Sequence, residues 1–303
     1  MKWRGGRQSR NVDDRTGRSS SSGGMLAAGG GMLAAGGGIG TVIIAVLFFL
    51  FSGGDLNSLP DVLGGSGQAA NYQTENVGTS EYTEEKEFSA VVFGYLEDYW
   101  QDVFQERQET YQDPTLVLFT GSVQSACGYA TSQVGPFYCP ADENVYLDLS
   151  FANELSDKYG ASGDFAMAYV IAHEVGHHVQ NELGITQQLD KIRQQVSEKE
   201  YNQYSVRLEL QADYLAGTFA KYLQGETYQG QPILEAGDIQ EAITAANAIG
   251  DDTLQKEYQG YVVPDSFTHG TSQQRVDWFN RGYRYGDLAH GDTFNVDSLD
   301  LSK

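Results

Sequence analysis

The stretch AMAYVIAHEVGHHVQNEL, residues 166–183, decides the fold of this chain and points to its chemistry. Its small and apolar residues recur at helical spacing up to Gly184, so it is predicted to be a buried helix. His173 and His177 then lie one turn apart on one face, where both imidazoles can bind the same metal ion. Glu174 is displaced by about 100° from His173, so its carboxylate could reach a water on that ion without being a ligand.

A catalytic zinc ion needs a third protein ligand and keeps its fourth position for water. The candidate is Glu209, 32 residues after His177 in the predicted helix RLELQADYLAG. Asp213 follows one turn later and could accept a hydrogen bond from a ligating imidazole. The small residues Ala212 and Gly217 would let this helix approach the first one closely. The alternative is that the two carboxylates belong to a solvated acidic face, which is the ordinary role of such a pair.

The segments HEVGHH and LELQAD resemble the gluzincin pattern, as in thermolysin, where H-E-x-x-H is completed by a glutamate on a later helix. Two more segments, GPFYCPADENVYLDLSF (135–151) and VVPDSFTHGTSQQRVDWF (262–279), are similar to the neutral zinc metallopeptidase family of bacterial single-pass membrane proteins. This resemblance covers residues 90–295 or so. It implies a zincin-like peptidase domain with one Zn²⁺ per chain and a peptide or protein substrate, and it leaves the substrate's identity open.

The segment THGTSQQR, which contains His269 and Arg275, resembles the downstream histidine motif of membrane-linked gluzincins. By that resemblance, His269 would donate to the oxyanion of the tetrahedral intermediate, and Arg275 would position it or bind backbone carbonyl groups. From the residues alone, the favoured interpretation of His269 is an ordinary polar residue of a loop. Family members often carry a second cysteine pair where this chain has Tyr214 and Gly291, so its carboxy-terminal tail lacks that cross-link.

The resulting hypothesis is zinc-assisted hydrolysis of peptide bonds with Glu174 as the general base. The peptide is expected to lie as an added strand along the edge formed by residues 145–149. Two alternatives are a non-catalytic, zinc-stabilised binding module outside the cell and a metal-free helical domain with a chance motif. Glu174 argues against the binding module, because a structural zinc site does not need it. His178 points about 100° away from His177, which favours a packing role.

The first part of the chain is predicted to anchor it in the cell membrane. Residues 1–31 begin with a basic tip, and no charged residue occurs from Ser19 to Gly54. The apolar run at 32–52 would span about 30 Å as a helix, so it is predicted to be one transmembrane helix. Its basic flank is expected in the cytoplasm, which places the peptidase domain outside. Because no small-x-small cleavage site follows, an uncleaved anchor is favoured over a removed signal peptide.

The remainder is divided into a flexible linker at 53–80, rich in Gly, Ser, Asn and Gln, and a peptidase domain at 81–303. From residue 53 onward, 13 basic residues face 39 acidic ones. A domain this acidic is repelled by phosphate backbones, so nucleic acid is a poor candidate partner. The oligomeric state leaves no trace in the sequence.

The two cysteines, Cys127 and Cys139, lie twelve residues apart in CGYATSQVGPFYC. Outside the cell a disulfide is the favoured state. A zinc site at these residues is disfavoured, because no Cys-x-x-Cys pair or neighbouring histidine accompanies them, and two buried thiols are the remaining alternative.

The other elements follow from periodicity and turn signals, and they predict a single, mainly helical α+β domain. The predicted strands, at 116–120 and 145–149, are expected to form a small antiparallel sheet. The predicted helices are 83–108, 165–183, 187–224 with a break near Glu200 to Tyr204, 238–249 and 271–283, with an irregular tail beyond about Gly286.

Overall fold

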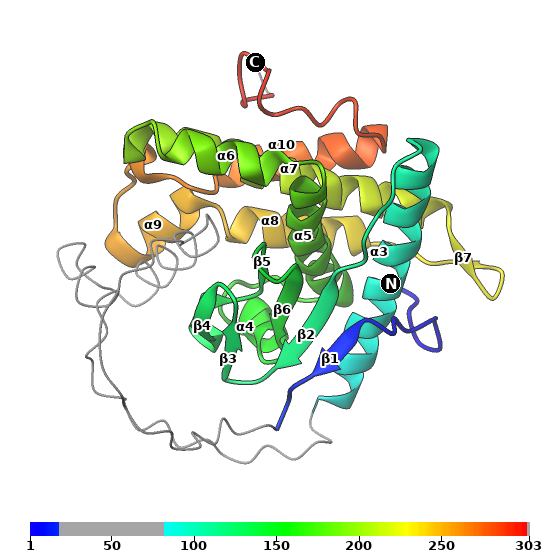
Figure 1. Ribbon diagram of the computed structural model, residues 1–303. Coiled ribbons are helices and arrows are strands. Elements are labelled where there is room, and N and C mark those ends of the chain that lie inside the picture. The colour runs from blue at the N-terminus through cyan, green and yellow to red at the C-terminus, as the bar shows by residue number, and fades with distance from the viewer. Residues whose placement is uncertain (18–81, 302–303) are drawn as a thin grey trace, which may run out of the picture.

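The computed structural model of the protein describes residues 1–17 and 82–301, and its helices and strands confirm the predicted α+β fold (Figure 1). The helices are α3 (Thr83–Glu106), α4 (Phe151–Asp157), α5 (Asp164–Glu182), α6 (Ile185–Arg193), α7 (Glu198–Gly225), α8 (Asp238–Ala248), α9 (Asp251–Gln259) and α10 (Ser272–Tyr285). The strands are β1 (Val12–Asp14), β2 (Thr115–Phe119), β3 (Ser122–Ser125), β4 (Gly128–Thr131), β5 (Phe137–Cys139), β6 (Asn144–Asp148), β7 (Thr227–Tyr228) and β8 (Gln231–Pro232).

Helix α5 occupies the centre of the fold. Fourteen of its nineteen residues are buried, as expected for a helix that is covered on nearly all sides. It contacts β5 and β6 of the sheet on one side, and α3, α7 and α8 on others. The sheet lies at one end of the molecule, with α7, α8 and α10 stacked beyond it and α3 along its flank (Figure 1).

The long helices lie close to the predicted ranges, but three details differ. The break between α6 and α7 falls at residues 194–197 and not at 200–204, because Ser197 caps α7 by accepting the N–H of Glu200 at 3.3 Å. Helices α4 and α9 were not predicted. They have seven and nine residues, too few for a helical period to be recognised.

The sheet is mixed, so the prediction of an antiparallel sheet is wrong. Strands β2 and β6, which contain the two predicted runs, pair parallel, with Leu116 opposite Val145. Strand β1 pairs parallel to β2, and β5 pairs antiparallel to β6, which gives the order β1-β2-β6-β5. Strand β5 precedes β6 and turns directly onto it through residues 140–143, so these two strands pair antiparallel. Strand β2 comes earlier in the chain and pairs with the other edge of β6 after a crossover, so that pair is parallel.

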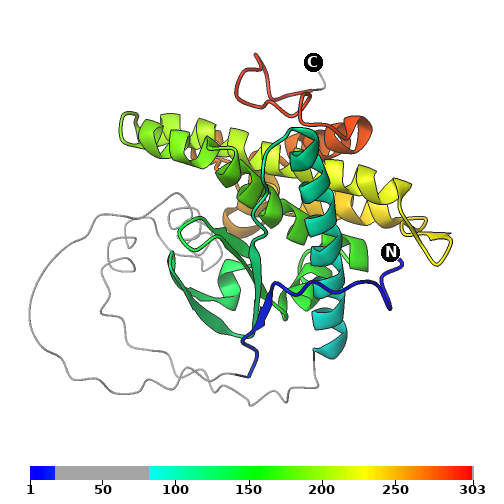
Figure 2. The same ribbon diagram turned by 45° about the vertical axis from the view of Figure 1, so that its right-hand side comes forward.

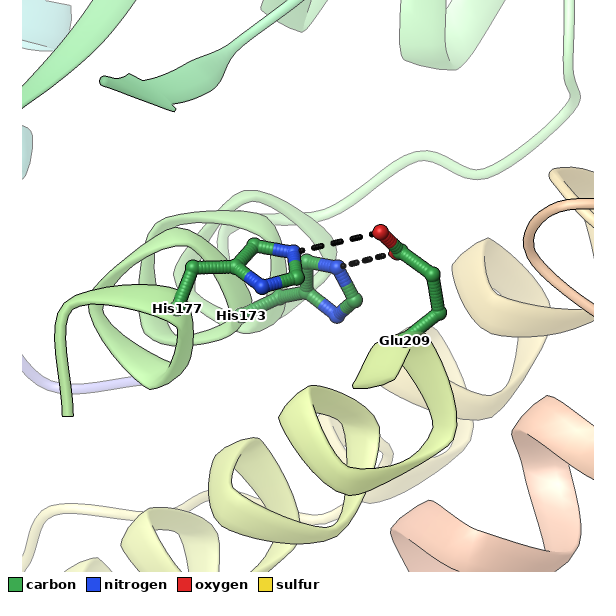
Figure 3. A group of neighbouring side chains, drawn as sticks. All are labelled: His173, His177 and Glu209. Atoms are coloured by element: carbon green, nitrogen blue, oxygen red, sulfur yellow. Dashed lines mark hydrogen bonds and ion pairs between the residues drawn. The ribbon is translucent and has the colours of Figure 1, made fainter. Parts of the chain in front are cut away.

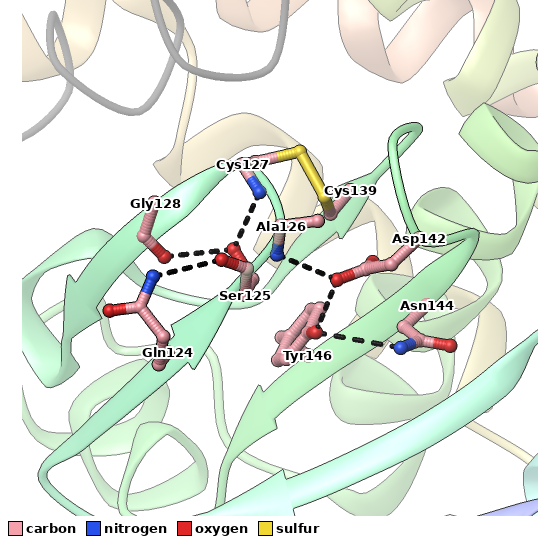
Figure 4. The surroundings of a disulfide bond; sticks show 9 residues. All are labelled: Gln124, Ser125, Ala126, Cys127, Gly128, Cys139, Asp142, Asn144 and Tyr146. Carbon is pink, nitrogen blue, oxygen red and sulfur yellow. Dashed lines mark hydrogen bonds between the residues drawn. A yellow bond between two sulfur atoms is a disulfide. The ribbon is translucent and has the colours of Figure 1, made fainter.

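The predicted disulfide between Cys127 and Cys139 is present (Figure 4). It ties the turn of the β3–β4 hairpin to the end of β5. Asp142 reinforces this link, since its Oδ2 accepts the N–H of Ala126 and the hydroxyl of Tyr146, both at 2.8 Å. The hairpin is therefore held against the strand at the end of the sheet.

Small residues let α7 approach two different helices. At the crossing with α5, a Cβ atom on Gly176 would lie 3.3 Å from the backbone of Ala212. The expectation that Gly217 also faces α5 is wrong, because Gly217 lies against α10. Five residues along a helix rotate the side-chain direction by about 140°, so Ala212 and Gly217 face different neighbours.

Gly217→Ala is expected to lower the free energy of unfolding by about 2 kcal/mol, as overpacking of a close contact does. The added Cβ would overlap the backbone of Phe279 and Tyr283 on α10. Gly225→Ala is the matched control on the same helix, because a Cβ there meets nothing within 4 Å. Denaturant unfolding of both variants measures the difference, and equal stability would contradict the close crossing of α7 and α10.

The described residues also bear on the predicted membrane anchor. Within 1–17 and 82–301, no helix is long and apolar enough to cross a bilayer. The predicted transmembrane helix at 32–52 and the linker at 53–80 lie outside the described residues. Residues 1–17, assigned by sequence to a basic cytoplasmic tip, pack along α3 and contain β1 (Figure 2).

Candidate metal centre

The three predicted ligands meet between α5 and α7 (Figure 3). His173 Nε2 lies 3.1 Å from Glu209 Oε2, and His177 Nε2 lies 3.5 Å from Glu209 Oε1. The side chains of His173 and Glu209 are buried, whereas that of His177 is 16% exposed. The structure thus brings the pair of imidazoles and the later carboxylate to one point, with His177 as the ligand nearest to solvent.

The donor set and its spacing fit zinc. Imidazole nitrogen and carboxylate oxygen bind Zn²⁺ at about 2.0–2.2 Å in a tetrahedron, which places neighbouring donors about 3.3 Å apart. The separations of 3.1 Å from His173 to Oε2 of Glu209 and of 3.5 Å from His177 to Oε1 are close to that value, and one donor atom from each of the three residues lies within 4.8 Å of the other two. Three protein ligands leave one position of the tetrahedron for water or substrate, as in catalytic zinc sites.

The Nδ1 atom of each of these two histidines has a hydrogen-bond partner. His173 Nδ1 donates to Asp213 Oδ1 at 2.9 Å, and His177 Nδ1 donates to Gln180 Oε1 at 2.9 Å. These acceptors favour a proton on Nδ1, which is the arrangement that leaves Nε2 as the nitrogen for a metal. Asp213 lies one turn after Glu209 on α7, so a single helix supplies both a ligand and the support of another ligand.

Asp213 is the centre of a buried network that includes Arg275. Its Oδ1 accepts the hydroxyl of Tyr169 at 2.6 Å, and Arg275 donates to both carboxylate oxygens at 2.9 and 3.0 Å. Burial raises the pKa of the Asp213 carboxyl, but Arg275 and His173 outweigh burial and lower this pKa to about 2. Arg275 also donates to the Ile249 carbonyl oxygen at 3.3 Å. Arg275 therefore lies behind His173 and fixes the group that orients it.

Glu174 lines the same cavity as the three ligands. Burial raises the pKa of its carboxyl, and the opposing effects of His177, His173 and a backbone hydrogen bond from Tyr138 do not cancel the increase. A carboxyl group whose pKa is raised toward neutrality can accept a proton and return it in the same reaction cycle. Glu174 therefore lies beside the three converging side chains as a carboxyl group with a raised pKa.

His269 enters the cavity from the loop before α10. Its Nδ1 lies 3.2 Å from Asp251 Oδ1. Asp251 Oδ2 accepts the backbone N–H groups of Thr268, His269 and Gly270 at 2.7 to 3.0 Å, which fixes this loop. Burial lowers the pKa of His269, but Glu209 and Asp251 outweigh burial and raise it. With Nδ1 directed at Asp251, Nε2 is the nitrogen left to donate to a substrate oxygen.

Asp251 is a functional candidate that the sequence reasoning missed. In the sequence, Asp251 and Asp252 form an acidic pair directly after Gly250, and such a pair is typical of a helix start. Asp252 accepts the N–H of Ser272 at 2.7 Å and supports α10 in the usual way. A helix start does not reveal that Asp251 turns its carboxylate toward a histidine 18 residues later.

The cavity has a volume of ≈ 340 Å³ and passes along strand β5. Phe137 and Tyr138 of β5 form part of its wall, and Phe151 and Tyr159 add aromatic surface. The expectation that a peptide adds to residues 145–149 is wrong, because β6 already pairs with β2 and β5. Strand β5 is the edge of the sheet at the cavity, so it is the strand available to an extended peptide.

His178, next to the metal motif, points away from the ligands. Its Nε2 donates to the Gln112 carbonyl oxygen at 2.7 Å, and its Nδ1 accepts the Tyr138 hydroxyl at 3.0 Å. It is fully buried, and burial lowers its pKa. His178 thus binds β5 to α5 as a neutral side chain.

Tyr214 and Gly291, which replace the cysteine pair common in the resembling family, are neighbours in the structure. A Cβ atom on Gly291 would lie 2.5 Å from the Tyr214 ring, so the ring occupies the space beside the glycine. The Tyr214 hydroxyl donates to the Asp287 carbonyl oxygen at 2.7 Å, and Gln211 Nε2 donates to the Gly291 carbonyl oxygen at 3.0 Å. Hydrogen bonds and ring packing therefore hold the tail to α7.

Comparison with known proteins finds relatives that match most of the chain. The chain is 47% identical over 296 residues to the uncharacterized protein YpfJ of Escherichia coli (strain K12), which covers 97% of this chain and 99% of that protein. It is 43% identical over 195 residues to the uncharacterized protein Rv2575 of Mycobacterium tuberculosis (strain H37Rv), which covers 62% of this chain and 65% of that protein. No solved structure matches the chain.

A family profile described as "Putative neutral zinc metallopeptidase" matches residues 1–294. The match includes both the ligand-bearing helices and the first seventeen residues. The chain therefore belongs to the neutral zinc metallopeptidase family.

Proposed function

We propose that the protein is a zinc-dependent endopeptidase in which Glu174 is the general base. The observation that carries this proposal is the convergence of His173, His177 and Glu209 on one point of a cavity that also contains Glu174 and His269. A non-catalytic zinc-stabilised module would need neither the cavity nor Glu174 beside the ligands.

Each residue has a defined part in this proposal. A zinc ion held by the three ligands supplies a Lewis acid for the scissile carbonyl group and activates water. Glu174 takes the proton of the attacking water and hands it to the leaving amine. His269 donates from Nε2 to the oxygen that becomes negatively charged, with Asp251 fixing the imidazole. Asp213 keeps His173 in the tautomer that binds metal.

The edge strand β5 suggests how the substrate lies. An extended peptide can pair with its main chain, and such pairing aligns a backbone without demanding a particular sequence. The aromatic wall of the cavity, which includes Phe151 and Tyr159, favours apolar side chains beside the cleaved bond. The proposed substrates are therefore extended segments of peptides or unfolded proteins.

We also propose that the peptidase domain lies outside the cytoplasm and is attached to the cell membrane through the apolar residues 32–52. The disulfide between Cys127 and Cys139 supports the first part, because such bonds persist in oxidising compartments. The apolarity of the run and the absence of charged residues from it support the second part, whether or not the run crosses the bilayer.

The test uses the full-length chain purified in detergent, because residues 1–17 pack on the domain. We expect one zinc ion per chain by metal analysis and cleavage of a quenched peptide library. Chelation should abolish cleavage, and added zinc should restore it. Zinc binding without cleavage of any peptide would favour the non-catalytic module, and absence of zinc would overturn the proposal.

Asp251→Asn is expected to lower kcat by about 10- to 100-fold, as the loss of an orienting side chain does, and to leave the zinc content unchanged. The amide keeps the size of Asp251 but binds the imidazole of His269 less strongly. Asp252→Asn is the matched control, because Asp252 bonds to Ser272 and not to His269. Equal kcat for the two variants would remove Asp251 from the catalytic machinery.

A further inference from the structure

The first seventeen residues are bound to the peptidase domain along their whole length. Strand β1 adds to the edge of β2, with Val12 opposite Leu116 and Asp14 opposite Leu118. The N–H of Leu116 donates to the Asn11 carbonyl oxygen and that of Arg15 to the Leu118 carbonyl oxygen, both at 2.8 Å. In Figure 2 this segment runs across α3 before it reaches the sheet.

The amino terminus itself is buried between the starts of two helices. The α-ammonium group of Met1 lies 3.2 Å from Asp238 of α8 and 3.6 Å from both Asp164 of α5 and Glu235. Burial lowers the pKa of this amine, but the three carboxylates outweigh burial and raise it. Trp3 Nε1 donates to Asp164 Oδ2 at 3.0 Å. The chain end is thereby attached to the first residue of the helix that carries His173 and His177.

The middle of the segment is bound around a buried carboxylate of α3. Glu97 is 6% exposed, and its side chain accepts hydrogen bonds from Ser9, from Asn11 at 2.9 Å and from Arg7 at 3.2 Å. All three donors come from the segment. The backbones also approach closely here, because a Cβ atom on Gly94 would lie 2.8 Å from the Arg7 carbonyl oxygen.

This complementarity shows that the segment completes the domain. Without residues 1–17, the carboxylate of Glu97 would lose its three donors and would have to be hydrated in their place. Asp164, Glu235 and Asp238 would also lose the cation that they surround. Trp3, which is 4% exposed and packs edge-on against Phe88 at 5.5 Å, would no longer cover that apolar surface.

We propose that residues 1–17 are a structural part of the peptidase domain in the membrane-attached protein, joined to it by strand β1 and by the buried amino terminus. The amino terminus then lies on the same side of the membrane as the domain. A single crossing by residues 32–52 would place β1 and β2 on opposite sides, and their pairing could not form. A second copy could not supply the strand either, because its amino terminus would be on the wrong side too. This inference rests on the membrane attachment proposed above, but it does not depend on peptidase activity.

The proposal replaces the cytoplasmic amino terminus expected from the basic flank. That expectation treats the basic residues as free charges. In the folded unit, Arg4 pairs with Glu84, and Arg7 pairs with Glu97 at 3.2 Å and with Asp98 at 2.7 Å. Their charges are compensated by the acidic domain, so they need not hold the segment in the cytoplasm.

The first experiment measures sidedness in cells that express the full-length chain with one added cysteine. Arg10→Cys reports on the segment and Asp102→Cys on the domain, and both positions are exposed. A membrane-impermeant maleimide is applied to cells whose outer envelope is permeable to it, and labelling is compared with that after lysis. The parental chain gives the background, because its two cysteines form a disulfide.

Equal labelling of both variants in intact cells is the expected result. Equal protection of both would keep the inference and instead overturn the extracytoplasmic location in the proposed function. Labelling of one variant with protection of the other, in either direction, would overturn the inference.

The second experiment tests the pairing of β1 with β2 in the same cells. Val12→Cys with Leu116→Cys places two thiols on directly opposed residues of neighbouring strands, about 4.8 Å apart and within disulfide range. Val12→Cys with Phe119→Cys is the control, because the second thiol is displaced by three residues and faces the other side of the sheet. Peptide mapping without reduction should find the cross-link in the first pair alone. Equal cross-linking, or none in a folded and disulfide-bonded chain, would contradict the docked strand.

Discussion

Glu174→Gln is expected to lower kcat for peptide hydrolysis by about 10³-fold, within the range that a positioned general base contributes. The amide has the same shape but cannot take a proton from water. Zinc content should stay at the parental value, because Glu174 is not among the three converging ligands. Stopped assays on a quenched peptide, together with metal analysis, measure both quantities.

The stability of this variant provides an internal check. Burial raises the pKa of the Glu174 carboxyl, so its ionised form is disfavoured in the folded state. A neutral amide should therefore leave the melting temperature unchanged or slightly higher at neutral pH. Glu182→Gln, on the same helix and outside the cavity, is the matched control and should keep full activity. Retained turnover in Glu174→Gln would assign the base to another group.

Glu209→Gln is expected to weaken zinc binding by more than about 100-fold, since losing a ligand should exceed the 10- to 100-fold effect of losing an outer hydrogen bond. Glu209 faces both imidazoles, and His177, His269 and His173 lower the pKa of its buried carboxyl well below the usual value despite the opposing effect of burial. An amide oxygen is uncharged and is a poorer ligand for Zn²⁺. Competition with a chromogenic chelator measures the affinity.

The loss should also appear in thermal unfolding. A metal that binds only the folded chain raises the melting temperature with its concentration, and this zinc-dependent shift should disappear in Glu209→Gln. Glu200→Gln is the control on the same helix, because Glu200 is exposed and distant from the motif. If Glu209→Gln bound zinc as tightly as this control, the third ligand would be a different residue and the assignment of the centre would fail.

The site was predictable to the extent that it depends on helix geometry. A spacing of four residues in a helix places His173 and His177 on one face in any fold, and the same rule places Asp213 behind Glu209. Asp251 was beyond this reasoning, because it meets His269 through a loop whose path depends on packing. Arg275 belonged to a recognisable motif, but the sequence did not show that its partner is Asp213.

The sequence by itself determined the long helices, the pair of histidines with the adjacent glutamate, the candidate third ligand and the disulfide. These features depend on periodicity, cap residues, motifs and the spacing of the cysteines, all of which are present in the order of residues before the chain folds. Periodicity also tells which face of a helix or strand is buried, but it does not name the neighbour that covers it.

Only the tertiary structure decided the neighbours. It made the sheet mixed, turned Gly217 toward α10 and not α5, and left β5 as the edge strand at the cavity. It also placed the basic residues 1–17 on the acidic domain. The physical reason is that strand pairing, buried ion pairs and close helix crossings join residues that are distant in sequence. Whether one such contact forms depends on the packing of the whole domain around it.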